Sequence, residues 1–172
     1  MQCTEEIYMN YKEFEIIPAF SEEEKIAELF GEYTQYLVDN DPVFAEYLAI
    51  QKYDDELNDL EHKYGMPNGR LYIALDGDKA AGCVGLRKLD DDTCELKRMY
   101  VRPEYRGRGL ARFFGEMIMR EGAEIGYKYM LLDTLPFLKA AQSLYKKLGF
   151  YEINRYNNSP MEDAIYMRYD FV

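Results

Sequence analysis

Hydrophobic residues recur along the chain with two periods, one typical of helices and one of strands. Residues 14–17 form a short expected strand. Ser21-Glu22-Glu23-Glu24 has the pattern of a capping box, in which the Ser21 hydroxyl accepts from the Glu24 amide, and it predicts a helix start. The helix that follows carries Ile26, Leu29, Phe30 and Tyr33 on one face. Asp41-Pro42 predicts the start of a second helix, which continues through Leu57 and Leu60 toward Gly65.

The remaining chain changes from strands alone to strands alternating with helices. A meander is expected over residues 71–75, 81–86 and 95–101, with a tight turn at Asp76-Gly77-Asp78. Residues 129–133 form a strand between two amphipathic helices, and Gly149 ends the second helix. Residues 150–153 and 164–169 are the last expected strands. The order of elements predicts an α/β fold with a mixed sheet.

Length and composition favour one globular domain over residues 1–172. The chain is 48% hydrophobic, yet it has no apolar run long enough for a membrane helix and no apolar signal core near its acidic start. Cys3, Cys83 and Cys94 cannot all pair and lack the spacing of a metal site. We therefore expect a cytoplasmic protein without a bound metal or a membrane.

The net charge of −11 is unevenly distributed. Residues 1–94 have 8 basic and 22 acidic side chains, and residues 95–172 have 13 basic and 10 acidic ones, so the two parts carry −14 and +3. The total argues against nucleic acid as a partner. The acidic part favours solubility and, more weakly, small cationic substrates such as polyamines or aminoglycosides.

A glycine-rich segment with several arginines, Arg102-Pro103-Glu104-Tyr105-Arg106-Gly107-Arg108-Gly109-Leu110-Ala111, lies between an expected strand and an expected helix. Its glycines allow a sharp turn, the helix start offers unpaired amides, and the arginines add positive charge. The sequence therefore predicts an anion site. Gly-Lys-Ser/Thr of a P-loop is absent, and Arg112 replaces the third glycine of a dinucleotide fingerprint.

Arg106-x-x-Gly109-x-Ala111 resembles the acetyl-CoA signature of the GNAT superfamily of N-acetyltransferases. The likeness continues through Leu132-Asp133-Thr134 and through Ala141-Gln142-Ser143-Leu144-Tyr145-Lys146-Lys147-Leu148-Gly149-Phe150. Leu138 replaces an asparagine common in the family. The resemblance implies a GNAT-like acyl-CoA N-acyltransferase fold, with a mostly antiparallel sheet, splayed central strands and flanking helices.

The same resemblance implies acetyl-CoA as cosubstrate, with the strand Met99–Val101 pairing to the pantetheine arm and the strand 129–133 splaying away. The pyrophosphate would bind amides from Arg106 through Arg112. The implied cofactor-binding residues are Met99, Tyr100, Val101, Arg106, Gly107, Arg108, Gly109, Leu110, Ala111, Arg112 and Thr134. Arg102, Arg108 and Arg112 are candidates for the adenosine phosphates, with solvated surface charge as the alternative for each.

Tyr145 matches the tyrosine that gives a hydrogen bond or proton to the departing thiolate in this family; the alternative is an aromatic residue at the edge of the core. Glu95 is the first candidate for the general base, Asp133 the second, and a water chain remains open. A salt bridge is an equal alternative for Glu95. Strand alternation places Glu95, Lys97 and Met99 on one face, unless a bulge changes the parity.

The sequence thus predicts a transferase that moves acetyl from acetyl-CoA to a primary amine, by direct attack in a ternary complex. A small-molecule acceptor is favoured, and a homodimer is compatible with the sequence. The alternatives are a CoA-binding regulatory module without activity and a protein N-terminal or lysine acetyltransferase. Residues 156–160 are a weaker candidate for the acceptor site, with an ordinary connecting loop as the alternative.

Overall fold

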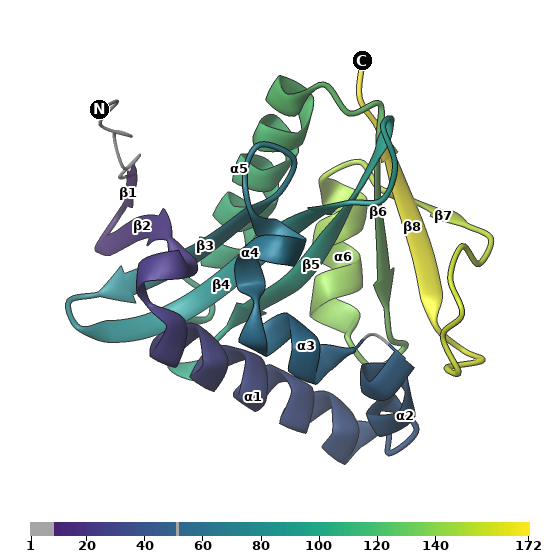
Figure 1. Ribbon diagram of the computed structural model, residues 1–172, viewed down its shortest axis with the longest axis horizontal. Helices are drawn as coiled ribbons and strands as arrows, with labels where there is room; N and C mark the ends of the chain where they lie inside the picture. Colours follow the sequence, from purple (N-terminus) through teal and green to yellow (C-terminus); the bar gives the residue numbers. More distant parts are fainter. Residues whose placement is uncertain (1–8, 51) are drawn as a thin grey trace.

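A computed structural model describes residues 9–50 and 52–172, in which eight strands form one twisted sheet (Figure 1). The strands are β1 (Met9–Tyr11), β2 (Phe14–Pro18), β3 (Arg70–Asp76), β4 (Lys79–Lys88), β5 (Thr93–Val101), β6 (Tyr129–Thr134), β7 (Tyr151–Ile153) and β8 (Ile165–Asp170). They lie in the order β1-β2-β3-β4-β5-β6-β8-β7. Neighbouring strands are antiparallel except β5 and β6, which are parallel. The predicted mixed, mostly antiparallel sheet is confirmed.

Helices cover both faces of this sheet (Figure 1). They are α1 (Glu23–Asn40), α2 (Phe44–Ile50), α3 (Tyr53–Asn58), α4 (Leu60–Tyr64), α5 (Leu110–Ile125) and α6 (Lys139–Lys147), with 3-10 turns η1 (Ala19–Ser21) and η2 (Pro103–Tyr105). The apolar residues of α1 and α4 pack on one face in one core cluster, and those of α5 pack on the other face in a second cluster. None of the helices in the described ranges is long and apolar enough to span a bilayer.

Two predictions about the first helices are wrong. Helix α1 begins at Glu23 after Glu22, whose side chain makes no capping bond, because residues 19–21 already form a 3-10 turn that is closed by the Glu22 amide on the Ala19 carbonyl. The second predicted helix is three short ones. Lys52 has a left-handed backbone (φ 54°) that ends one helical path before the next begins, and Asp59 caps α4 by accepting from the His62 amide.

A β-bulge interrupts β5 in the middle of the sheet. Lys97 pairs with Gly85 of β4 and Tyr100 pairs with Cys83, so Arg98 and Met99 together oppose one residue. Arg98 has a positive φ of 54°, which is uncommon for a residue with a side chain. The bulge reverses the alternation of faces.

The bulge is the stated exception to the shared face of Glu95, Lys97 and Met99, and it moves Met99 off that face. After the bulge, Arg98 lies over the ring of Phe30 on the α1 face, and Met99 packs with the core on the α5 face. Glu95, Lys97 and Arg98 consequently lie on the same side of the sheet. Three charged side chains of β5 are thereby brought close together.

Strands β5 and β6 separate after a short paired segment. Thr93–Glu95 pair with Tyr129–Leu131, and beyond them the described part of β6 pairs with β8 alone. The predicted splay of the central strands is thereby confirmed. It leaves the edge of β5 from Leu96 to Val101 without a strand partner on the β6 side.

Candidate active site

The turn between β5 and α5 has the geometry that the sequence predicts for an anion site. Gly107 and Gly109 have φ values of +78° and +85°, a backbone region that favours glycine. Helix α5 starts directly after Gly109, which serves as N-cap without a side-chain bond. The first amides of the helix thus have no intrahelical acceptor and the helix dipole is positive at this end.

A groove of about 520 Å³ runs from this turn along the open edge of β5. One wall is formed by predicted residues, namely Met99, Tyr100, Val101, Arg106, Gly107, Gly109, Leu110, Ala111 and Arg112. The opposite wall comes from α6 and the residues before it, including Leu138, Ala141, Leu144 and Tyr145, with Tyr33 and Tyr36 of α1 at one end. The structure therefore brings most of the predicted cofactor residues to one groove.

The arginines near the groove are each held by an acceptor within the chain. Their partners are Glu32 for Arg102 (2.6 Å), the Val101 carbonyl for Arg106 (2.9 Å), Glu13 for Arg108 (2.8 Å) and Glu116 for Arg112 (2.8 Å). Arg106 and Arg112 line the groove, whereas Arg102 faces α1 and Arg108 lies beside the ring of Tyr105. Arg102, bound to Glu28 and Glu32 of α1, does not line the groove.

Tyr145 lies on α6 where the groove meets a second, narrower pocket. The residue is 6% exposed and lines both cavities. Burial raises the pKa of its phenol, with smaller contributions from Tyr33 and Asp133, so the group is protonated at neutral pH. The hydroxyl has no hydrogen-bond acceptor within residues 9–50 and 52–172, which leaves its proton available to a ligand.

The second pocket, of about 50 Å³, lies between the splayed strands. It shares Tyr33, Met99, Leu138 and Tyr145 with the groove, and its charged lining residues are Lys97, Arg98 and Asp133. Thr134, predicted as a cofactor contact, lines this pocket instead of the groove. A molecule in the groove and a molecule in the pocket would thus meet beside Met99 and Tyr145.

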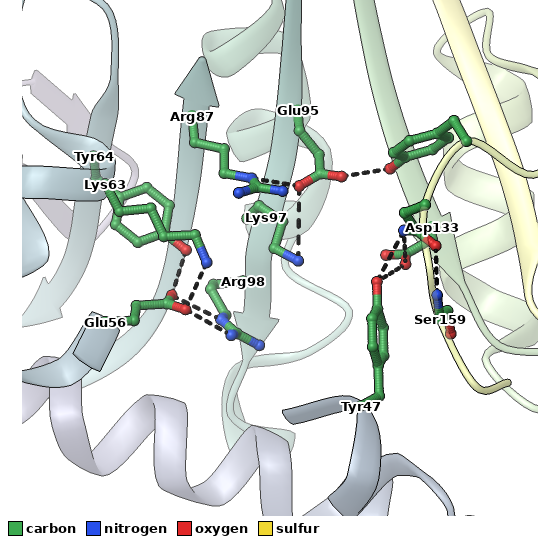
Figure 2. Close-up of polar contacts among 12 residues, drawn as sticks. Tyr47, Glu56, Lys63, Tyr64, Arg87, Glu95, Lys97, Arg98, Asp133 and Ser159 are labelled. Atoms are coloured by element: carbon green, nitrogen blue, oxygen red, sulfur yellow. Dashed lines mark hydrogen bonds and ion pairs between the residues drawn. The ribbon is translucent and has the colours of Figure 1, made fainter. Parts of the chain in front are cut away.

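Glu95 is buried at the closed end of the gap between β5 and β6 (Figure 2). Its Oε1 atom lies 2.7 Å from Nε of Arg87 and 3.7 Å from Nζ of Lys97, and its Oε2 atom accepts from the Tyr156 hydroxyl at 2.5 Å. Burial acts to raise the pKa of Glu95, but the charges of Lys97 and Arg87 outweigh it and the pKa is lowered. The carboxylate is therefore ionised and occupied on both oxygens.

Asp133, at the end of β6, faces Glu95 and Lys97 across the gap (Figure 2). Its Oδ2 atom accepts from the Tyr47 hydroxyl of α2 and from Nδ2 of Asn157 at 3.0 Å. Both donors are neutral. The loop of residues 156–160 thus contributes Tyr156, which bonds to Glu95, and Asn157, which bonds to Asp133. Tyr47 had no signal in the sequence.

A second buried charge cluster stabilises the bulge from the α3 side (Figure 2). Glu56 accepts from Nε and Nη2 of Arg98 at 3.0 and 2.8 Å, from Lys63 at 2.7 Å and from the Tyr64 hydroxyl at 2.5 Å. Burial acts to raise the pKa of Glu56, but the hydrogen bonds and charges of Arg98 and Lys63 together outweigh it, so the pKa is lowered. Glu56 had no signal in the sequence, where it looks like one of many acidic residues on exposed helices.

Comparisons with known proteins agree with this fold. The profile of the Acetyltransferase (GNAT) family matches residues 19–150, and the chain belongs to this family. A Schizosaccharomyces pombe protein named as an N-acetyltransferase is 39% identical over 127 residues, 73% of this chain and 78% of that protein. Human N-acetylaspartate synthetase is 33% identical over 111 residues, 63% of this chain and 36% of that protein.

An acetyltransferase from Streptococcus agalactiae has the same fold, with a TM-score of 0.77 at 24% identity, covering 94% of this chain and 100% of that one. The protein is an acetyl-CoA-dependent N-acetyltransferase of the GNAT family. The predicted family and enzyme class are confirmed.

Replacing Gly109 with Ala should weaken acetyl-CoA binding about tenfold, or about 1.4 kcal/mol. A Cβ there would lie 2.6 Å from the Tyr11 hydroxyl on a backbone with φ +85°, so the start of α5 must shift. Gly77→Ala is the matched control, because Gly77 also has positive φ (+59°) but has open space and lies in the β3–β4 turn. Titration calorimetry with acetyl-CoA measures both. Equal affinities of the two variants would contradict the assignment of this turn.

Proposed function

We propose that the protein transfers the acetyl group of acetyl-CoA to the primary amine of a small molecule, by direct attack within a ternary complex. The observation that carries this proposal is the meeting of two cavities beside Tyr145 and Met99. The groove joins the anion-binding turn to the open edge of β5, the two features that a CoA ester needs. The pocket between the strands is a separate, polar chamber for an acceptor.

The donor is bound by backbone more than by side chains. Amides from Arg106 through Arg112 receive the pyrophosphate at the start of α5. The unpaired edge of β5 at Met99–Val101 receives the pantetheine arm as an added strand. The backbone amides of this edge of β5 also polarise the thioester carbonyl when acetyl-CoA is bound.

Acetyl transfer uses groups on both sides of the place where the groove meets the pocket. The amine nitrogen forms a C–N bond with the acetyl carbon as the C–S bond breaks, and the sulfur leaves with the bonding electrons. The Tyr145 hydroxyl donates a proton to that thiolate and regains one from solvent. The acceptor ammonium first loses one proton through water toward Asp133, which makes the amine nucleophilic, and the nitrogen loses a second proton as the amide forms; both protons pass on to solvent.

Asp133 is a better acceptor for the amine proton than Glu95. Glu95 has a lowered pKa and both of its oxygens are engaged by Arg87, Lys97 and Tyr156. Asp133 lines the acceptor pocket and its partners are the neutral donors Tyr47 and Asn157. We assign Asp133 to the amine and Glu95 to fixing Tyr156 and the cations of β5.

A small acceptor suits the pocket better than a protein. Its volume of about 50 Å³ is enclosed by the side chains of α1, α2, β5 and β6. The human relative is named for N-acetylaspartate, a small molecule.

Three further features stay predictions. They are a cytoplasmic location, an extent of one domain over residues 1–172 and a homodimer.

Release of CoA thiol from acetyl-CoA, measured over a panel of primary amines, tests the function. We expect release above the amine-free rate with at least one small amine, and Asp133→Asn should lower its kcat about 100-fold. Glu95→Gln is the comparison and should lower kcat less.

The reverse pattern, in which Glu95→Gln lowers kcat more than Asp133→Asn does, would make Glu95 the base. Release with peptide amines alone would establish a protein acceptor. No release with any amine, while calorimetry shows acetyl-CoA bound, would overturn the proposed function in favour of a CoA-binding module.

A further inference from the structure

The two walls of the acceptor pocket carry opposite charge. On the β5 side, the cations Arg87 and Lys97 share the carboxylate of Glu95, and the cations Arg98 and Lys63 share that of Glu56. Only Lys97 and Arg98 of these residues line the pocket, and with Arg87 and Lys63 behind them four cations share two carboxylates among the described residues. On the β6 side stands Asp133, whose described partners are neutral.

The bulge of β5 is what turns this surplus toward the pocket. In a regular strand Lys97 and Arg98 would point to opposite faces. The positive φ of Arg98 instead places both on the side of α1 and α3, where both line the pocket. Lys97 is 7% exposed and Arg98 is 5% exposed, so bulk water screens neither charge strongly.

We propose that the acceptor is a small amine that also carries a carboxylate, of the amino-acid class, with its carboxylate toward Lys97 and Arg98 and its ammonium toward Asp133. This inference rests on the proposed function and names its substrate class. Lys97 and Arg98 are then specificity-determining residues. Anchoring both ends of the molecule would direct the amine at the junction beside Tyr145.

This assignment runs against the bulk charge of the chain. The acidic first 94 residues favour cationic substrates such as polyamines from their total alone. Within the pocket, however, two of the three charged lining residues are cations, and a polyamine would place a second positive charge against them. Local charge at contact distance outweighs net charge that is screened over about 8–10 Å.

The matched test compares each amino acid with its own carboxamide, which removes the negative charge and little else. We expect kcat/KM to be at least about tenfold higher for the acid, with spermidine as the cationic reference. Titration of the same pairs into CoA-saturated protein gives a reading that does not depend on turnover. Equal or better use of the carboxamides or of spermidine would overturn the inference.

The matched variants are at Lys97. Lys97→Met should raise KM for the amino acids about tenfold and abolish the preference over carboxamides, whereas Lys97→Arg should preserve it. Lys128→Met is the control. Lys128 is exposed, pairs with Asp92 and lies directly before β6, whereas Asp133 of the pocket lies near the end of that strand. If Lys97→Met fails to fold, as thermal melting would show, Lys97→Arg and the ligand pairs still decide.

The two proposals fail in different ways. Absence of thiol release with every amine would sink the proposed function, while calorimetry would still show whether acids bind better than carboxamides. Release with amines that lack a carboxylate, at equal efficiency, would leave the acetyl transfer intact and refute the acceptor class.

Discussion

Tyr145→Phe is expected to lower kcat about 100-fold while acetyl-CoA affinity stays within about twofold of the wild type. The substitution removes one hydroxyl from the junction of the two cavities and keeps the ring that contacts Phe150 at 5.9 Å. The departing thiolate then loses its hydrogen donor, and the loss falls on the chemical step. Steady-state kinetics and calorimetry with acetyl-CoA separate the two quantities.

The loss should be nearly constant between about pH 6 and 9, because burial raises the pKa of Tyr145 and the phenol stays protonated over that range. Tyr127→Phe is the matched control. Tyr127 is also buried, but its hydroxyl donates to the Asn68 carbonyl at 2.7 Å. A Tyr145→Phe enzyme with unchanged kcat, or a Tyr127→Phe enzyme with the same loss, would refute the role of Tyr145.

Glu56→Gln is expected to cost about 3–5 kcal/mol of unfolding free energy at neutral pH, because it leaves Arg98 and Lys63 as buried cations without their carboxylate. The β5 bulge depends on this cluster, so acetyl-CoA affinity should fall as well. Urea unfolding measures the first effect. Glu22→Gln, in a partly exposed pair with Lys25, is the control and should cost less than about 1 kcal/mol.

The same cluster predicts acid sensitivity. The pKa of Glu56 is lower in the folded protein than its unfolded value of about 4.3, so its stabilisation is complete above that value and is lost as pH falls toward the folded pKa. The wild type should therefore lose stability more steeply below about pH 4.3 than Glu56→Gln does.

A double variant keeps this prediction testable if the single one unfolds. Glu56→Leu with Arg98→Met replaces both side chains by apolar ones, and it should be more stable than Glu56→Leu alone because the buried Arg98 charge is removed together with its carboxylate. A Glu56→Gln protein within about 1 kcal/mol of the wild type would show that the cluster does not stabilise the bulge.

The elements found correctly from the sequence are those defined by residues close together in the chain. The meander of β3, β4 and β5 follows from alternation and from the Gly77 turn, and α5 and α6 follow from apolar residues every three or four positions. The end of α6 before Gly149 follows from the left-handed backbone that glycine adopts there, with φ +101°.

Errors arose where a local pattern had more than one structural solution. Ser21 and Glu24 satisfied the pattern of a capping box, but η1 displaced the start of α1 by packing Ala19 into the core. The segment after Pro42 has the pattern of one helix, but the left-handed backbone of Lys52 interrupts it. In the resulting arrangement, Glu56 accepts from Arg98. The three-residue strand β1 was too short to carry a pattern.

The sequence by itself determined the fold class, the family and one wall of the groove proposed for acetyl-CoA, because residues 99–112 lie within one strand, one turn and one helix start. The acceptor pocket was decided by the tertiary structure alone. Its polar contacts join residues separated by 42 positions (Arg98 and Glu56), 61 (Tyr156 and Glu95) and 110 (Asn157 and Tyr47). A charge acts on its neighbours in space, and only the splay of β6 and the bulge of β5 make these residues neighbours.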